Sequence, residues 1–267
     1  MTTQPRLAST VMLIRDLGAG TSGLEVFMVR RVVQSEFMPD VYVFPGGSVS
    51  LDDCSAEETP GLCVQVLVSP GIDPQGRTAL GTGARAAAIR ELFEEANVLL
   101  AYHDGQLLAI DQQRAERFAT YRQAFNQRQG SLLEMARRES LVLATDQLVY
   151  CAHWITPEGL PKRYDTHFFL AKAPAQQEAI YDRLETSDGV WIEPEAALER
   201  FATGTFPIAF PTYHQLRALS AFSSTEEALQ AAALRPIATQ QPRLKEVDGV
   251  PHVYLPDEPE QLWSLQS

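Results

Sequence analysis

Three carboxylates lie close together in the segment Arg-Glu-Leu-Phe-Glu-Glu-Ala-Asn-Val, which spans residues 90–98. If the segment is helical, Glu91, Glu94 and Glu95 occupy positions i, i+3 and i+4 and share one face. Like charges at this spacing repel by roughly 0.2–0.5 kcal/mol per pair in an exposed helix. They also lie near the expected end of the helix, where the helix dipole disfavours anions. A hard divalent cation bound through oxygen ligands would compensate for this repulsion.

The composition of the 267-residue chain is that of a globular protein, with 45% hydrophobic and 21% charged residues. A formal net charge of −12 argues against a nucleic-acid backbone as the main partner. An acidic chain can still bind a phosphorylated small molecule if metal ions supply positive charge locally. The three cysteines lack zinc-site spacing and indicate a reducing, cytoplasmic compartment, and the lack of an 18-residue apolar run predicts no membrane span.

Short apolar runs bounded by turn residues predict the strands that must position these groups. The first two are residues 7–15 and 24–31, separated by a glycine-rich turn. A third run at 41–44 ends in Pro45-Gly46-Gly47, and a double glycine lets the backbone turn sharply and approach a ligand closely. Later strands are expected at 149–155, 163–171 and 189–192.

Residues 82–96 are rich in alanine and predict the helix that carries the glutamates. Asn97 suits the left-handed position that follows a helix end. Residues 111–129 and 131–140 predict a helical hairpin, and the remaining helices are expected at 195–202, 212–221 and 225–233. Strands flanking a central helix, with helices after them, predict an α+β fold with α/β/α layers.

The expected domain organisation is one domain over residues 1–235, followed by an extended C-terminal arm at 236–267 that packs on it. Two insertions interrupt the domain. Residues 48–81 are rich in proline and glycine and predict an irregular segment with a short strand at 63–68, and residues 106–140 carry the helical hairpin.

Residues 90–98 resemble the second half of the Nudix box. That box runs Gly, five residues, Glu, seven residues, then Arg-Glu-apolar-any-Glu-Glu-any-Gly-apolar. Asn97 stands where glycine is usual, a mild change because asparagine also tolerates the left-handed conformation. Phe44-Pro45-Gly46-Gly47 resembles the strand-to-loop entry of the box.

The chain departs from the box in its first half. Gly47 to Thr82 spans 35 positions where the box needs six, so about 29 residues are inserted. Counted back from Arg90, the first glutamate of the box falls on Thr82. The acids nearby in the insertion that could replace it are Asp52, Asp53, Glu57 and Glu58.

The insertion resembles that of the long-insert subgroup of Nudix hydrolases, which includes coenzyme A diphosphatases. Short segments along most of the chain carry this resemblance. They are Arg30-Arg31, Phe37-Met38-Pro39, Val43-Phe44-Pro45-Gly46-Gly47, Trp154-Ile155-Thr156-Pro157-Glu158, Asp165-Thr166-His167-Phe168-Phe169 and Pro211-Thr212-Tyr213.

The resemblance implies a Nudix-like mixed sheet and a set of site residues. Glu91, Glu94 and Glu95 would bind Mg²⁺ or Mn²⁺, with Glu91 as a further ligand or a base. Arg90 would orient the glutamates. Glu185, preferred here to Asp188, would be the general base outside the helix. Substrate contacts would come from Gly46, Gly47, Arg30 and Arg31.

These residues favour metal-dependent hydrolysis of the pyrophosphate bond in a nucleoside-diphosphate-linked metabolite, with coenzyme A or acyl-coenzyme A as candidates. Two alternatives stay open: a Nudix-fold nucleotide sensor with weak or no hydrolysis, and a pyrophosphatase of the ADP-ribose or NADH type. The partner is a small nucleotide, with neither nucleic acid nor membrane, and a homodimer through the insertions is a further alternative. His153 and His167 alternate with apolar residues and are expected to be structural.

Overall fold

The computed structural model describes residues 3–18, 20–34, 39–67, 71–73, 76 and 78–265. Phe37 and Met38 of the family resemblance, and residues 68–70, 74, 75 and 77 of the first insertion, lie outside the described residues. Among the described residues, no helix combines the length and apolar character that crossing a bilayer requires.

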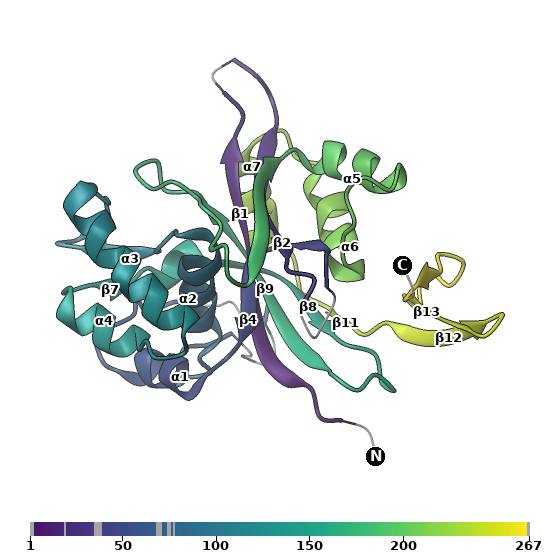
Figure 1. The fold of residues 1–267 in the computed structure, drawn as a ribbon, viewed down its shortest axis with the longest axis horizontal. Helices are drawn as coiled ribbons and strands as arrows, with labels where there is room; N and C mark the ends of the chain where they lie inside the picture. The colour runs from purple at the N-terminus through teal and green to yellow at the C-terminus, as the bar shows by residue number, and fades with distance from the viewer. Residues whose placement is uncertain are drawn as a thin grey trace.

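A mixed eight-stranded sheet forms the centre of the molecule (Figure 1). Its strands run in the order β10-β2-β1-β9-β8-β11, with β3 on β2 and β4 on β1. The β1–β9 and β8–β11 pairs are parallel and the others antiparallel. The bounds are β1 Arg6–Asp16, β2 Leu24–Arg31, β3 Tyr42–Val43, β4 Gly46–Ser48, β8 Val149–Ile155, β9 Tyr164–Lys172, β10 Thr186–Ile192 and β11 Thr239–Gln240.

Helices cover both faces of this sheet (Figure 1). Val11 and Leu13 of β1 pack in one buried cluster with the helices before β8, and Met12 and Ile14 pack in a second cluster with the later helices. This alternation confirms the α+β fold with a mixed sheet. The first layer is α1 Leu51–Glu58, α2 Ala84–Ala96, α3 Gln112–Asn126 and α4 Leu132–Arg138, and the second is α5 Pro194–Ala202, α6 Phe210–Leu219 and α7 Thr225–Leu234.

Helix α2 begins two residues after the predicted start and ends at the predicted residue, Ala96. Asn97 follows its last residue in the left-handed region (φ 60°), and its N–H donates to the carbonyls of Leu92 and Phe93. The alanines of its first turns are fully buried, so the helix lies close to β1. This close packing fixes where the three glutamates lie relative to the sheet.

The first insertion differs from the irregular segment expected. Residues 51–58 form helix α1, which begins with a capping box between Ser50 and Asp53. The short strand expected from residue 63 is absent over the described residues 63–67, where Cys63 makes one isolated bridge to Leu143. A small sheet of β5 Ala101–His103, β6 Gln106–Leu107 and β7 Val142–Leu143, and a 3₁₀ turn at Thr145–Gln147, were not expected.

The C-terminal residues form more regular structure than an extended arm. After β11, strands β12 Arg243–Val247, β13 Val250–Tyr254 and β14 Trp263–Ser264 pair as an antiparallel sheet. The Trp263 ring stacks on Phe201 of α5 with centroids 4.8 Å apart, and Val253 is buried in the second cluster.

Candidate active site

A cavity of about 690 Å³ lies beside the carboxylate face of α2. Its walls come from β4, β9, the start of α6 and the tip of the α3–α4 hairpin. This volume is within the range of small-molecule sites. Of the residues expected to act, Arg90, Glu91, Glu94, Glu95, Glu185, Gly46, Gly47 and Arg31 line it.

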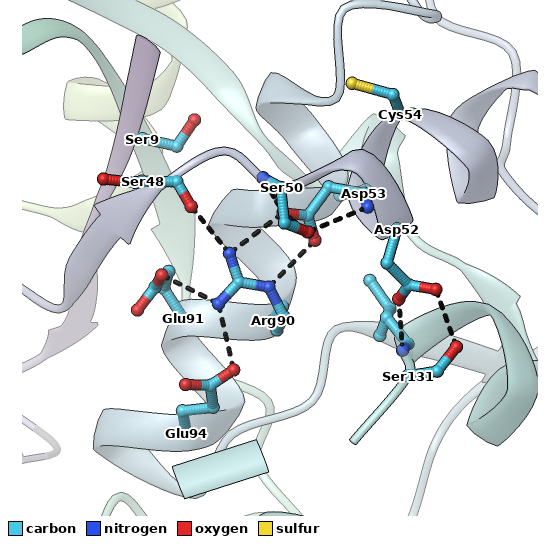
Figure 2. Close-up of polar contacts among 12 residues, drawn as sticks. Ser9, Ser48, Ser50, Asp52, Asp53, Cys54, Arg90, Glu91, Glu94 and Ser131 are labelled. Atoms are coloured by element: carbon cyan, nitrogen blue, oxygen red, sulfur yellow. Dashed lines mark hydrogen bonds and ion pairs between the residues drawn. The ribbon is translucent and has the colours of Figure 1, made fainter. Parts of the chain in front are cut away.

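Arg90 is the centre of the polar network under this cavity (Figure 2). Its Nη1 donates to Glu91 Oε1 at 2.8 Å and to Glu94 Oε1 at 2.9 Å. Its Nε and Nη2 form a fork on Asp53 with both bonds at 2.9 Å, and Nη2 also donates to the Ser48 carbonyl. Burial opposes the guanidinium charge, but Glu91, Asp53 and Glu94 raise the pKa of Arg90 on balance. Arg90 therefore stays charged and holds two glutamates in fixed rotamers.

The four acids of the insertion have different positions. Asp53 binds Arg90, and the neighbouring Asp52 accepts from Ser131 Oγ and Leu132 N–H, both at 2.6 Å, at the start of α4 (Figure 2). Glu58 is exposed. The sequence did not distinguish among these four acids, but the box places five residues between its glycine and its first glutamate, and after Gly47 that position is Asp53. The insertion therefore follows this acid, and Thr82 is an unrelated residue near the start of α2.

Glu57 caps α2, a role that sequence reasoning missed. Its Oε2 accepts the N–H groups of Gly81 and Gly83 at 2.8 Å, and its Oε1 accepts those of Arg85 and Ala86 at 2.7 and 2.8 Å. The residue before the helix is a glycine with no side chain to cap it. The carboxylate of Glu57 thus satisfies four donors at the positive end of the helix dipole.

The two glycines bring β4 against the glutamates. The N–H of Gly46 donates to Glu95 Oε2 at 3.0 Å. A Cβ atom on Gly47 would lie 2.3 Å from Glu91 Oε1, so a larger residue would push this carboxylate away. The double glycine therefore allows contact between the backbone and the carboxylates.

The glutamates carry more negative charge than their surroundings neutralise. Burial raises the pKa of Glu91 to about 7, against the attraction of Arg90. Burial also raises the pKa of Glu94, and it raises that of Glu95 well above its usual value, with Glu91 as the next cause. One guanidinium is shared by Asp53, Glu91 and Glu94, so the cluster is anionic when its carboxyl groups ionise. Hard oxygen donors with excess negative charge fit a divalent cation such as Mg²⁺ or Mn²⁺.

Glu185 lines the cavity from the end of the loop that precedes β10. Its charge contributes to the raised pKa values of Glu94 and Glu95. The loop is tied to α2 by Arg122 of α3, which donates to the Glu94 carbonyl at 2.8 Å and to the Ile180 carbonyl at 2.7 Å. Asp188 is bound by the Tyr42 hydroxyl at 2.5 Å and does not line the cavity.

The two arginines at the end of β2 point in different directions. Arg31 lines the cavity, and its positive charge lowers the pKa of Glu95, against the larger effect of burial. Arg30 does not line it, and its Nε lies 2.9 Å from Asp40 Oδ1 in a surface ion pair. Adjacent strand residues face opposite sides of a sheet, which accounts for the difference.

A second group of possible ligands lies on β8 and β9. His153 and His167 are cross-strand neighbours, and their ligand atoms and that of Asp165 all lie within 4.8 Å of one another. Their rings are stacked with an interplanar angle of 7°, so their in-plane lone pairs lie in two parallel planes and do not converge on one ion. The His153 ring is hydrogen-bonded through Nδ1 to Thr239 Oγ1 and through Nε2 to Asp165 Oδ1. These two bonds join β8 to β11 and to β9. We interpret this cluster as structural.

Comparisons with known proteins agree with this geometry. The crystal structure of a Nudix hydrolase from Alicyclobacillus acidocaldarius matches with a TM-score of 0.70 and 25% identity, covering 88% of this chain and 99% of that chain. The acyl-coenzyme A diphosphatases NUDT19 of Xenopus laevis and Gallus gallus are 27% and 28% identical to it. Each alignment covers 78% of this chain, and 62% and 64% of those proteins. The chain thus spans less than two thirds of the length of these relatives.

A family model described as the NUDT19 Nudix domain matches residues 78–219, more than half of the chain. The chain belongs to this family of Nudix domains. The matched range contains Arg90, the three glutamates and Glu185, and it begins after Gly47 and Asp53. The resemblance to the Nudix family that the sequence predicts is confirmed.

Proposed function

We propose that this protein hydrolyses the pyrophosphate bond of coenzyme A or an acyl-coenzyme A, with Mg²⁺ or Mn²⁺ as cofactor. The observation that carries the proposal is the arrangement of Glu91, Glu94 and Glu95, of which Arg90 holds two, along a cavity of suitable size. The names of the NUDT19 relatives support the substrate class.

Each residue has a distinct part in this proposal. Glu91, Glu94 and Glu95 hold the divalent cation, which when bound neutralises phosphate charge and lowers the pKa of water. Glu185 accepts a proton from the attacking water as its oxygen bonds to one phosphorus. The bond from that phosphorus to the bridging oxygen breaks, and two phosphate monoesters leave. Arg31 binds a phosphate oxygen through its guanidinium.

The contacts of Arg90 favour hydrolysis over the alternative of a nucleotide sensor with weak or no hydrolysis. The sensor alternative rested on the first box glutamate, whose place falls on Thr82 when counted back from Arg90. Asp53 instead contacts Arg90 through two bonds of 2.9 Å. An acidic partner for Arg90 in addition to Glu91 and Glu94 supports hydrolysis over binding alone.

The experiment is a substrate panel with the purified protein in Mg²⁺ or Mn²⁺. Coenzyme A, an acyl-coenzyme A, ADP-ribose, NADH and a dinucleoside polyphosphate are incubated, and products are separated by chromatography. We expect cleavage of the coenzyme A compounds to two phosphorylated products, and none in EDTA.

Glu94→Gln tests the assignment with minimal change in shape. It should lower kcat by at least roughly 100-fold, the scale expected when a catalytic electrostatic group is removed. Glu116→Gln on the exposed face of α3 is the matched control and should leave the rate unchanged. Faster cleavage of ADP-ribose or NADH than of the coenzyme A compounds would contradict the proposed substrate class. Equal rates for Glu94→Gln and the unchanged protein would contradict the assignment of the active site to this face of α2.

A further inference from the structure

We infer that the tip of the α3–α4 hairpin forms an anion subsite, in which Arg128 binds a phosphate monoester of the substrate outside the pyrophosphate. The inference rests on the proposed function for the identity of the substrate. Arg128 lies between the two helices of the second insertion and lines the same cavity as the glutamates. Arg6, the first residue of β1, lines it as well.

The hairpin tip is fixed on its α2 side. The Phe125 ring packs edge-on against Phe93 of α2, with centroids 6.0 Å apart. A Cβ atom on Gly130 would lie 2.5 Å from the Phe125 ring, so glycine is required there. The N–H of Arg128 donates to the Phe125 carbonyl at 2.7 Å, with Arg128 in the left-handed region at φ 57°. This conformation is uncommon for a residue other than glycine.

The tip is fixed on its α1 side by Asp52. Its carboxylate accepts from Ser131 and Leu132, the first residues after the tip (Figure 2). The next residue, Asp53, binds Arg90. One turn of α1 therefore connects the glutamate network to the hairpin, so the tip keeps a defined position relative to the glutamates.

The cations at this end of the cavity have no acidic partner within the described ranges. Neither Arg128 nor Arg6 makes a side-chain hydrogen bond or ion pair there, whereas Arg90 is fully engaged. An arginine fork matches the oxygens of a phosphate group. The pyrophosphate lies with the metal and the glutamates, so these arginines suit a separate anionic group. Coenzyme A carries one, the phosphate on its ribose.

The test compares coenzyme A with dephospho-coenzyme A, which lacks the ribose phosphate. We expect the unchanged protein to favour coenzyme A in kcat/KM. Arg128→Gln should lower kcat/KM for coenzyme A by about 10–100-fold through KM, and leave dephospho-coenzyme A within about 2-fold. Arg6→Gln should act in the same direction. Arg137→Gln, an exposed arginine on α4 outside the cavity, is the matched control. Equal losses on both substrates would overturn the inference.

A binding measurement separates this inference from the proposed function. In EDTA, calorimetry compares adenosine 3′,5′-bisphosphate with adenosine 5′-monophosphate, whether or not any substrate is cleaved. We expect the bisphosphate to bind about 10-fold or more tightly, and Arg128→Gln to remove that difference. Equal binding of both nucleotides by the unchanged protein would overturn the anion subsite, even if hydrolysis is observed.

Discussion

At the residue scale, the sequence spacing alone predicts that the three glutamates lie together. It does not predict all of the residues that hold the glutamates and their helix in place. The i, i+3, i+4 pattern places Glu91, Glu94 and Glu95 together once residues 84–96 are helical. The role of Asp53 could have been predicted from the sequence, because the box spacing counted forward from Gly47 places the first box acid there. Those of Glu57 and Arg122 could not, because their partners lie in segments that fold back over long chain distances.

Asp53 is expected to be a positioning residue for Arg90. Asp53→Asn removes the charge while keeping the size, so Arg90 is freed to turn fully toward Glu91 and Glu94. We expect kcat to fall by about 10–100-fold with little change in KM, the scale seen when a supporting residue of a metal site is lost. Steady-state kinetics at saturating metal measures this change.

Asp53→Glu restores the charge and the acid of the family box, so it should retain more activity than Asp53→Asn. Glu58→Gln, on the same helix and exposed, should have no effect. Identical kcat values for Asp53→Asn and the unchanged protein would show that Arg90 orders the glutamates without Asp53.

The raised pKa values predict how stability depends on pH without metal. Burial raises the pKa of Glu91 from 4.5 to about 7, and that of Glu95 well above 4.5. A carboxyl whose pKa is raised on folding contributes stability below its unfolded pKa and loses it as pH rises through the folded pKa. In EDTA, we expect the Tm to fall as pH rises from about 4.5 through about 7.

Glu95→Gln is the matched variant for this measurement. Its amide oxygen can still accept the Gly46 N–H, but it carries no charge. Above pH 7 in EDTA it should raise the Tm, by roughly 2–4 °C for each 1 kcal/mol of charge burial removed. A Tm for Glu95→Gln below that of the unchanged protein at pH 8 would contradict the account.

At the scale of elements, the main strands and helices follow from periodicity, whereas the insertion does not. Strands 24–31 and 149–155 have the predicted bounds. Helix α1 was missed because the density of proline and glycine around it indicated a loop, although Ser50 and Asp53 have the spacing of a capping box. The pairing of β12, β13 and β14 depends on contacts that a single segment does not reveal.

The capping of α2 by Glu57 predicts a stability effect. Glu57→Gln replaces a carboxylate that accepts four N–H bonds with a neutral amide that has one acceptor oxygen. We expect a loss of about 1–3 kcal/mol in the free energy of unfolding. Urea denaturation followed by circular dichroism measures it.

Glu58→Gln is the control for this effect, since Glu58 is the exposed neighbour on the same helix. It should change the unfolding free energy by less than about 0.5 kcal/mol. A Glu57→Gln variant as stable as this control would mean that the start of α2 does not need an anionic cap.

At the scale of the whole molecule, one site is built from segments that lie between Arg6 and Thr212 in the sequence. Strand β4, which pairs with β1, carries the two glycines, and α1 supplies Asp52 and Asp53. Helix α2 supplies the glutamates, and the hairpin tip and the loop before β10 line the cavity. The order of strands in the sheet links these segments, and local sequence patterns do not specify such non-local pairing.

Mn²⁺ binding tests the central claim most directly, because it asks whether the glutamates hold the metal. Electron paramagnetic resonance of free Mn²⁺ during titration gives the affinity of the unchanged protein, Glu94→Gln and Glu116→Gln. We expect Glu94→Gln to weaken binding by about 10-fold or more, and Glu116→Gln to match the unchanged protein. Equal affinities for all three proteins would contradict the assignment of the metal to this face of α2.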